Sequence, residues 1–203
     1  MTERAKLLVA TNNAGKLREY VRLLDGLPFE LSTLADEGIV EEVEETGLTL
    51  EENALQKASR YAALSGLITL ADDSGLEVDA LGGEPGPLSR RYAGNNATDG
   101  ERNDFLLSKL RDVPWERRGA RFRCVIAIAT PGGRVQTCEG VCEGVIAFDS
   151  RGWGGFGYDP VFCLPRLNKR VAELTLEEKN RISHRARAAQ KARPILEGLR
   201  HED

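Results

Sequence analysis

The feature that most constrains this chain is a short, mostly apolar run that leads into two adjacent carboxylates. Residues 67–70 (Leu-Ile-Thr-Leu) are rich in branched side chains and too few for a helix, which predicts a buried strand. Asp72, Asp73 and Ser74 follow, and Gly75 permits a sharp exit, so we expect the strand to end here with an acidic tip. Adjacent carboxylates at such a strand end are commonly neutralised by a divalent cation such as Mg²⁺. The alternative is an ordinary polar turn.

The composition is that of an ordinary globular chain. Its 203 residues are 41% hydrophobic and 30% charged, enough for one domain or two closely joined lobes. The formal net charge of −4 argues against nucleic acid as the main partner. No run approaches the roughly 20 apolar residues of a membrane span, and no apolar signal segment opens the chain, so we expect a cytoplasmic protein without a membrane partner. We expect reduced, structural thiols at all four cysteines, because their spacing matches no metal site.

A polar loop between a strand and a helix is the first candidate binding segment. Residues 6–11 predict a strand, and apolar residues recur at helical spacing over residues 17–24. The loop between them contains Thr11, Asn12, Asn13, Ala14, Gly15 and Lys16. Backbone N–H groups at a helix start suit a phosphate, and the lysine adds a full positive charge, although the loop lacks the Walker A pattern. The alternative is a helix cap formed by Asn12 or Asn13 with an exposed lysine.

An acidic segment precedes the second expected helix. Five glutamates lie within residues 37–45, and a capping box at residues 49–52 then opens a helix that leads into the acidic strand. Such an acidic run is usually a solvated loop. Because the segment and the strand tip flank one helix, a short return of the chain could bring Glu44 or Glu45 near Asp73 and supply several oxygens to one metal ion.

Further elements predict a mixed α/β fold. Strands are expected at residues 29–34 and 76–81, and a helix at residues 99–110. The core candidates of this helix are Phe105, Leu106 and Leu110. Two long antiparallel strands at residues 120–129 and 136–148, joined by a tight Pro-Gly-Gly turn, are expected to build a second lobe.

The C-terminal part predicts a last helical region. Thr175 and Glu178 form a second capping box that opens it, and we expect Pro194 to interrupt its final turns. The region carries His184 and Arg185, which are candidates for ligand contact. A basic surface or a nucleic-acid patch is the alternative interpretation.

Two other stretches could contact a nucleotide. Residues 152–160 combine four glycines with aromatic rings, so the backbone can approach a ligand closely while a ring offers its face to a planar base. The alternative is a strained turn with Phe156 and Tyr158 in the core. Arg90 and Arg91 follow a loop dense in glycine and proline, and their guanidinium groups could pair with a polyphosphate. Exposed surface arginines are the alternative there.

Taken in order, these segments resemble the inosine triphosphate pyrophosphatase family, whose members hydrolyse noncanonical purine nucleotides. The resemblance rests on the motifs TNNAGK (11–16), EETG (44–47), ENA (52–54), ADDSGL (71–76), GGFGYDP (154–160) and ISHR (182–185). Each motif is weak alone, but the ordered set is specific and covers nearly the whole chain. It implies one α/β domain over residues 1–203, with an elongated mixed β-sheet and flanking helices that form two lobes around a nucleotide cleft.

The resemblance also implies an activity and roles for individual residues. The activity is Mg²⁺-dependent hydrolysis of XTP, ITP and dITP to the nucleoside monophosphate and pyrophosphate by a homodimer. Asp73 would accept a proton and, with Glu44 or Glu45, bind the metal, while Lys16 would act catalytically. The implied substrate contacts are Thr11, Asn12, Asn13, Ala14, Gly15, Lys16, Ser74 and Arg91, with Phe156, Gly157, Tyr158, Asp159, Lys179, His184 and Arg185 around the base and sugar.

The chemistry of the reaction is consistent with these residues. Attack of water at the α-phosphorus builds charge on phosphoryl oxygens, so the site needs Mg²⁺ and cations more than a covalent nucleophile. Donors from His184 or Arg185 aimed at a 6-oxo group would accept hypoxanthine and xanthine and reject adenine. Two other functions stay open: a non-catalytic nucleotide- or RNA-binding protein, against which the acidic pair speaks, and a related pyrophosphatase for standard or methylated nucleotides.

Overall fold

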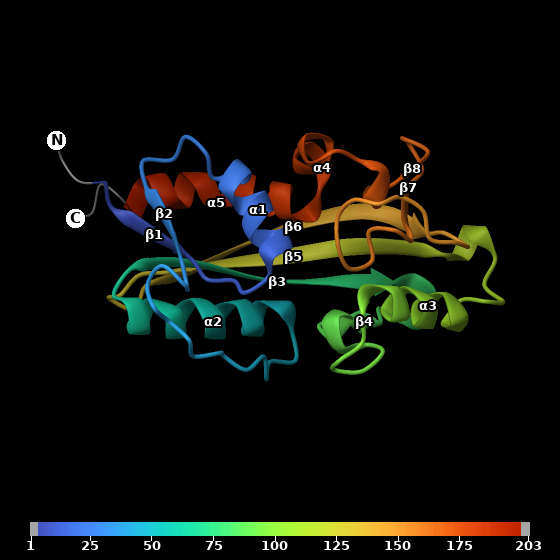
Figure 1. Ribbon diagram of the computed structural model, residues 1–203, viewed down its shortest axis with the longest axis horizontal. Coiled ribbons are helices and arrows are strands. Elements are labelled where there is room, and N and C mark those ends of the chain that lie inside the picture. The colour runs from blue at the N-terminus through green and yellow to red at the C-terminus, as the bar shows by residue number, and fades with distance from the viewer. Residues whose placement is uncertain (1–3, 200–203) are drawn as a thin grey trace. The chain divides into compact units, whose positions relative to one another are not determined.

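The computed structural model describes residues 4–199, in which strands and helices alternate along the chain (Figure 1). The strands are β1 (Lys6–Val9), β2 (Glu30–Thr33), β3 (Ile68–Val78), β4 (Pro85–Gly86), β5 (Gly119–Ala129), β6 (Val135–Ile146), β7 (Phe162–Leu164) and β8 (Lys169–Arg170). The α-helices are α1 (Ala14–Leu23), α2 (Leu50–Ser65), α3 (Asp99–Lys109), α4 (Leu176–Ile182) and α5 (His184–Leu199). Short 3₁₀ helices lie at Asp79–Leu81, Ser89–Arg91, Trp115–Arg117 and Val171–Glu173.

The strands form a mixed sheet. Their order is β2-β1-β3-β5-β6-β7-β8, with β4 beside β3. β1 pairs in parallel with β2 and with β3, and Leu7 lies opposite Leu31 and Ile68. The pairs β3–β4, β6–β7 and β7–β8 are antiparallel. The predicted mixed α/β fold with flanking helices is therefore confirmed.

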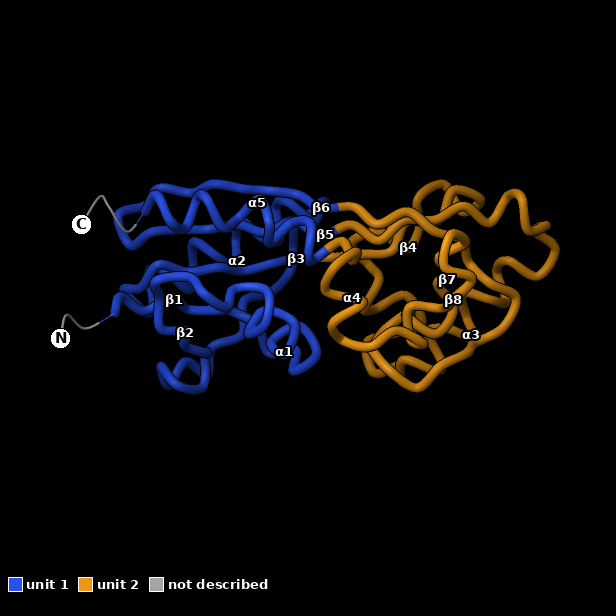
Figure 2. The backbone as a smooth tube through the Cα atoms, turned by 90° about the horizontal axis from the view of Figure 1, so that it is seen from above, with its two compact units in different colours: residues 1–73, 124–140, 185–203 blue, residues 74–123, 141–184 orange. Residues whose placement is uncertain are grey.

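The chain divides into two units, drawn in different colours in Figure 2. Unit 1 comprises Met1–Asp73, Cys124–Gly140 and Arg185–Asp203, and unit 2 comprises Ser74–Arg123 and Val141–His184. Because of these boundaries, β3, β5 and β6 contribute residues to both units. Among the described residues, unit 1 has two apolar cores and unit 2 has one.

In unit 1 helices cover both faces of the sheet, with α1 and α5 on one face and α2 on the other (Figure 1). Neighbouring residues of a strand therefore enter different cores. Leu7 shares a core with Tyr20 of α1 and Ala188 of α5, whereas Leu8 shares the other core with Ala58 of α2. Burial on both faces explains why Leu7, Leu8 and Val9 of β1 form a continuous apolar run.

In unit 2 one core joins the helices to the strands. Leu76 of β3, Leu106 of α3, Phe162 of β7 and Ile146 of β6 all belong to it, and all four are fully buried. Gly144 lies on β6 where an added Cβ would stand 2.4 Å from the Phe162 ring, so only glycine lets this ring pack against the strand.

Several local predictions are confirmed. The capping boxes at Thr49 and Thr175 begin α2 and α4, and the predicted hairpin is the β5–β6 pair. A third capping box, at Thr98, begins α3. All four cysteines are free thiols, as predicted. No helix within residues 4–199 is long and apolar enough to cross a membrane.

The prediction that a strand ends at the acidic pair is wrong. β3 continues through Asp72 and Asp73 to Val78, so the separate strand expected at residues 76–81 is its second half, followed by a 3₁₀ helix. The strand can continue because both carboxylates find polar partners, described below. Gly75 serves strand pairing and makes no turn: an added Cβ there would lie 2.3 Å from the carbonyl oxygen of Gly86 on β4.

Two further predictions about helices are wrong. α5 runs through Pro194, because Ala192 and Leu196 on either side are fully buried in the core and hold the helix in place. Phe105 is 36% exposed and does not enter the core. Its ring lies against the edge of Tyr92 at a centroid distance of 5.1 Å, with the Lys109 ammonium 5.2 Å from its centroid.

Candidate active site

Asp72 is the buried anion of unit 1. It is 2% exposed, and its Oδ2 lies 3.1 Å from Lys16 Nζ and 3.2 Å from Arg185 Nη2. Glu19 lies 2.6 Å from the same guanidinium. Burial acts to raise the pKa of Asp72, but the two cations outweigh burial and hold this pKa well below its usual value. Asp72 therefore stays negatively charged at neutral pH and binds Lys16 at the end of the loop at residues 11–16.

Asp73, the next residue of β3, has different partners. Asn53 Nδ2 donates to its Oδ2 at 3.0 Å, and Lys57 Nζ lies 3.5 Å from its Oδ1. Burial raises the pKa of Asp73 and outweighs the opposing effect of Lys57 and Lys16. Neighbouring carboxylates whose pKa values move in opposite directions are typical of sites that separate a charge holder from a proton acceptor. Asp73 is the residue suited to accept a proton.

Lys57 lies at the centre of an oxygen-lined position. Its Nζ is 2.7 Å from Glu45 Oε1, 2.7 Å from the backbone oxygen of Asp72 and 3.5 Å from Asp73 Oδ1. Carboxylate and carbonyl oxygens are the donors that Mg²⁺ prefers, and the ammonium shows that a cation is stable here. Among the described residues no group of three or more acidic, His or Cys side chains gathers to hold a metal by itself. The donor set nevertheless fits a hard divalent cation.

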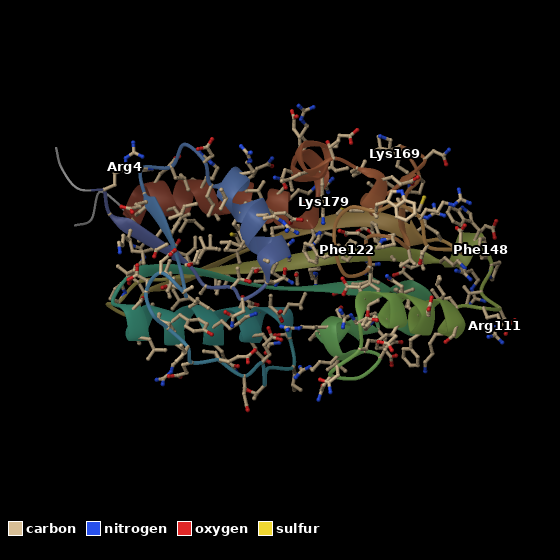
Figure 3. All side chains as sticks on the ribbon, in the orientation of Figure 1. Arg4, Arg111, Phe122, Phe148, Lys169 and Lys179 are labelled. Atoms are coloured by element: carbon tan, nitrogen blue, oxygen red, sulfur yellow. The ribbon has the colours of Figure 1, made fainter. Side chains whose placement is uncertain are left out.

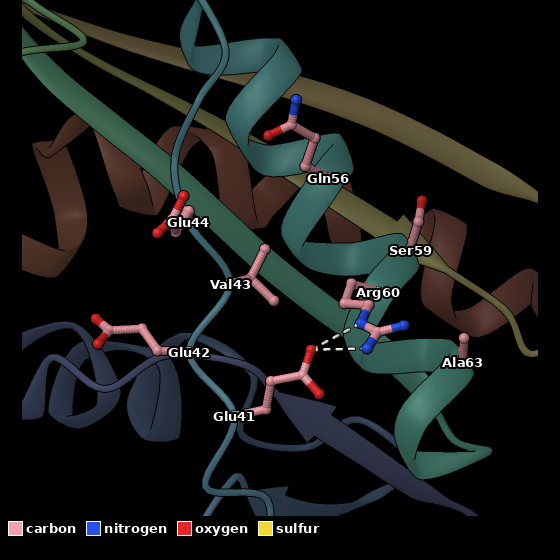
Figure 4. Close-up of a pocket in the computed structure, with 8 residues that line it drawn as sticks. All are labelled: Glu41, Glu42, Val43, Glu44, Gln56, Ser59, Arg60 and Ala63. Atoms are coloured by element: carbon pink, nitrogen blue, oxygen red, sulfur yellow. Dashed lines mark hydrogen bonds and ion pairs between the residues drawn. The ribbon is translucent and has the colours of Figure 1, made fainter.

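The two candidate metal ligands of the acidic segment lie in different surroundings. Glu45 reaches Lys57, whereas Glu44 is exposed and lines a groove of about 580 Å³ beside α2 (Figure 4). The groove is lined by Glu41, Glu42, Val43, Glu44, Gln56, Ser59, Arg60 and Ala63. Glu41 Oε1 lies 2.8 Å from Arg60 and fastens the segment to the helix. The structure brings Glu45 toward Asp73 and places Glu44 at the groove.

The loop at residues 11–16 forms a capped helix start. Asn13 Oδ1 accepts from the backbone N–H groups of Gly15 and Lys16 at 2.8 and 3.0 Å, and Thr11 Oγ1 accepts from Asn13 N at 3.2 Å. Asn12 and Ala14 are exposed. The helix cap by Asn13 is therefore observed, but Lys16 pairs with Asp72 and is not exposed, and phosphate binding by this loop stays a prediction.

Unit 2 gathers the residues predicted around the base. Asp159 Oδ2 lies 2.6 Å from Lys179 Nζ and accepts from Phe156 N at 2.9 Å, and the ammonium lies 4.5 Å from the Phe156 ring centroid. His184 stacks on Phe122 at 4.8 Å with an interplanar angle of 17°. Figure 3 shows Phe122 and Lys179 among the surrounding side chains. A small enclosed pocket is lined by Phe122, Cys142, Asp159, Leu164, Val171, Leu174, Lys179, Ile182, Ser183 and His184.

The loop at residues 152–160, called the aromatic loop below, requires glycine at position 155 and buries one of its aromatic rings. An added Cβ on Gly155 would lie 2.0 Å from Asp159 Oδ2, and its φ of +75° also favours glycine. Tyr158 is buried, and its hydroxyl donates to the carbonyl oxygen of Ser89 at 2.8 Å, whereas Phe156 stays half-buried. Tyr158 therefore fits the alternative of a ring in the core, whereas contact between Phe156 and a base stays a prediction.

Three predicted substrate residues remain. Ser74 and Arg91 lie outside the clusters described above, and Arg185 binds carboxylates of unit 1. Ser74 follows Asp73 on β3 and is half-buried, and Arg91 ends a 3₁₀ helix and is exposed. Arg185 is fully buried in unit 1, where Glu19 and Asp72 bind its guanidinium. Its neighbour His184 belongs to unit 2.

This site lies in a chain whose relatives are well defined. The model of the Ham1 family matches residues 7–195. The chain belongs to the Ham1 family. It is 56% identical to a dITP/XTP pyrophosphatase of Geobacter sulfurreducens over 90% of this chain and 92% of that one, and 46% identical to the dITP/XTP pyrophosphatase of Bacillus subtilis over 94% and 96%. The solved structure of a HAM1 protein from Coxiella burnetii superposes with a TM-score of 0.86 at 42% identity and covers 95% of this chain and 98% of that chain.

Sequence reasoning missed two residues beside the candidate site residues, one in each unit of this Ham1-family chain. Lys57 lies one helical turn after Asn53 on α2, so the same face of the helix carries both partners of Asp73. That spacing, on a helix that feeds the acidic strand, is a signal that could have revealed it. Phe122 lies in a strand whose apolar pattern indicates only core, and no sequence signal marks it as the partner of His184.

Proposed function

We propose that this Ham1-family chain hydrolyses the noncanonical purine nucleotides dITP, XTP and ITP to the nucleoside monophosphate and pyrophosphate. The observation that carries the proposal is the identity of 56% to a dITP/XTP pyrophosphatase over at least nine-tenths of both chains. The buried pair Asp72 and Asp73, with two lysines beside it, supplies the acid–base and charge groups that such a reaction needs.

The side chains of unit 1 support hydrolysis by water attack at the α-phosphorus. Asp73, with its raised pKa, orients the water and takes its proton. Lys16 and Lys57 place positive charge beside the carboxylates and stabilise the charge that develops on the phosphoryl oxygens. Asp73 and Glu45 would hold Mg²⁺, which when bound would supply Lewis-acid stabilisation of the phosphates. We prefer Glu45 to Glu44 as ligand because only Glu45 reaches the oxygen-lined position around Lys57.

The side chains of unit 2 support recognition of the base. Phe156 and Lys179 form one cation–π pair, and His184 lies at the enclosed pocket with Ser183. A donor from His184 toward a 6-oxo group would accept hypoxanthine and xanthine, whereas the 6-amino group of adenine would meet another donor.

We also propose a setting for this activity. The enzyme would act as a homodimer in the cytoplasm and keep deaminated purines out of DNA and RNA. The free thiols support a reducing compartment. Light scattering tests the dimer, for which the expected mass is twice the 22.3 kDa of one chain, and a mass of one chain would contradict it.

The experiment that tests the function is release of pyrophosphate from dITP, XTP, GTP and ATP at equal concentration, with and without Mg²⁺. We expect Mg²⁺-dependent release from dITP and XTP at least 100-fold faster than from ATP. Equal rates on all four nucleotides would overturn the base preference. Absence of release, together with steeply salt-dependent binding of RNA, would favour the non-catalytic alternative.

A further inference from the structure

Two side chains of helix α3 form hydrogen bonds with the backbone N–H and carbonyl groups of Gly157, in the aromatic loop at residues 152–160. The N–H of Gly157 donates to Asp99 Oδ2 at 2.6 Å, and Asn103 Nδ2 donates to its carbonyl oxygen at 3.1 Å. Asp99 and Asn103 lie one turn apart on the same face of α3, so one rigid helix determines where this backbone lies. Gly157 has a φ of +62°, a left-handed conformation that glycine adopts readily.

The burial of Asn103 indicates that its role is more than packing. The side chain is 3% exposed, and its Oδ1 has no hydrogen-bond partner within residues 4–199. A buried polar oxygen without a partner lowers stability, so an apolar residue of similar volume would suit the fold better. The presence of an amide is explained by its Nδ2 group, which donates to the carbonyl oxygen of Gly157.

The same turn of α3 also holds a second segment of unit 2. Arg102 binds Asp99 and donates to the carbonyl oxygens of Arg90, at 3.1 Å, and of Ala97. The segment between these two carbonyls begins at Arg91, a predicted substrate residue. The α3 turn at residues 99–103 therefore contacts two separate segments that carry predicted substrate residues.

We propose that Asp99 and Asn103 are positioning residues for recognition of the purine base. They fix the backbone of residues 156–159, and thereby the Phe156 ring and the Asp159 carboxylate that bind Lys179. Neither residue is among the groups of unit 1 that we propose to act on the phosphates. This inference rests on the proposed function, and it assigns to α3 a part of base selection that none of the motifs contains.

The decisive variant is Asn103→Leu, which keeps the volume and removes the donor. We expect KM for dITP to rise about tenfold with kcat within a factor of two, because the loop that contacts the base loses its support. Inhibition by inorganic tripolyphosphate, which has no base, should keep its wild-type Ki. The melting temperature should stay equal or rise, since the unpartnered oxygen is removed. Asp104→Leu is the matched control: it makes the same kind of change on the next, exposed residue of α3, and should leave all four values unchanged.

A second pair of variants keeps the test valid if Asn103→Leu does not fold. Asp99→Asn retains an oxygen that accepts from Gly157 N and should keep KM within twofold, whereas Asp99→Ala should raise KM about tenfold. An unchanged KM in folded Asn103→Leu, or an equal rise in KM and in the tripolyphosphate Ki, would overturn the proposal. Failure of the proposed function would show differently, as wild-type protein that releases no pyrophosphate from dITP.

Discussion

Two adjacent aspartates show how neighbours along the chain acquire opposite properties. Side chains of successive strand residues point to opposite faces, so Asp72 meets Lys16 and Arg185 while Asp73 meets Asn53 and Lys57 of α2. Two cations at its Oδ2 lower the pKa of Asp72, whereas burial that is only partly offset by nearby cations raises the pKa of Asp73. One carboxyl is thus held charged by its partners, and the other has a raised pKa that suits the proton-accepting role proposed for it.

We expect Asp73→Asn to abolish turnover while the protein stays folded. Loss of the general base should reduce pyrophosphate release from dITP at least about 100-fold. A raised carboxyl pKa favours the folded state only while the group is protonated, and this contribution is lost as pH rises through the folded-state pKa. At pH 7 the asparagine variant should therefore melt no lower than wild type. Exposed Asp112→Asn is the control, and a near-normal rate in Asp73→Asn would refute the assignment.

Asp72→Asn should behave in the opposite way in stability. The lowered pKa of Asp72 stabilises the folded state above the ordinary pKa of 3.8, and this contribution is lost as pH falls toward the folded-state pKa. Because buried Lys16 and Arg185 lose their partner, we expect the free energy of unfolding to fall by about 3–5 kcal/mol at pH 7. Urea unfolding at pH 7, 5 and 2.5 measures the difference in the free energy of unfolding between variant and wild type. This difference should persist at pH 5 and become smaller at pH 2.5. Equal differences at pH 7 and pH 2.5 would contradict this account.

At the scale of elements, the start of α2 connects Gly47, just after the acidic segment, to the carboxylate of Asp73. Gly47 N donates to Asn53 Oδ1 at 2.8 Å, and the amide of Asn53 donates in turn to Asp73. The capping box of Thr49 fixes the first turn of the helix between them. A shift of Gly47 would therefore move Asn53 on α2, and Asn53 contacts the Asp73 carboxylate on β3.

We expect Gly47→Ala to lower activity through this connection. An added Cβ would lie 2.6 Å from Glu52 Cβ and 2.8 Å from Asn53 Oδ1, so the asparagine must move away from Asp73. The rate of pyrophosphate release from dITP should fall at least about tenfold, as expected for a displaced catalytic contact. Gly198→Ala on α5 is the control, because nothing lies within 4 Å of its added Cβ. If both variants keep wild-type rates, Gly47 has no such role.

At the scale of the whole molecule, the division into two units does not separate the chain into two independent folding blocks. Unit 1 takes residues from three stretches of the chain and unit 2 from two. β3, β5 and β6 each pass from one unit to the other, so their hydrogen-bonded ladders belong to both. The loss of either core therefore breaks strands that the other core needs.

We expect thermal unfolding to be a single transition. Mutations in the core of either unit should lower its temperature. Leu7→Ala in unit 1 and Leu106→Ala in unit 2 remove fully buried side chains, and each should lower the free energy of unfolding by about 2–5 kcal/mol. Scanning calorimetry of the two variants should show a single peak shifted as a whole. Exposed Leu88→Ala is the control, and a second peak that only one variant shifts would contradict a shared transition.

The sequence by itself determined several of the local elements and indicated the family. Apolar periodicity, capping boxes and turn residues act within a few positions, so α2, α4 and the β5–β6 hairpin could be predicted. The ordered motifs likewise indicated the family that the comparisons show.

Only the tertiary structure decided how these parts meet. β3 continues through Asp72 because Arg185, 113 residues away, binds that carboxylate, and no local pattern encodes such a partner. Glu45 and Glu44 are adjacent in sequence, yet only one reaches Lys57, because a loop of the acidic segment is fastened to α2 by contacts across distant positions. Local propensity acts through the chain, whereas charge pairing and burial act through space, and the site is built from the second kind of interaction.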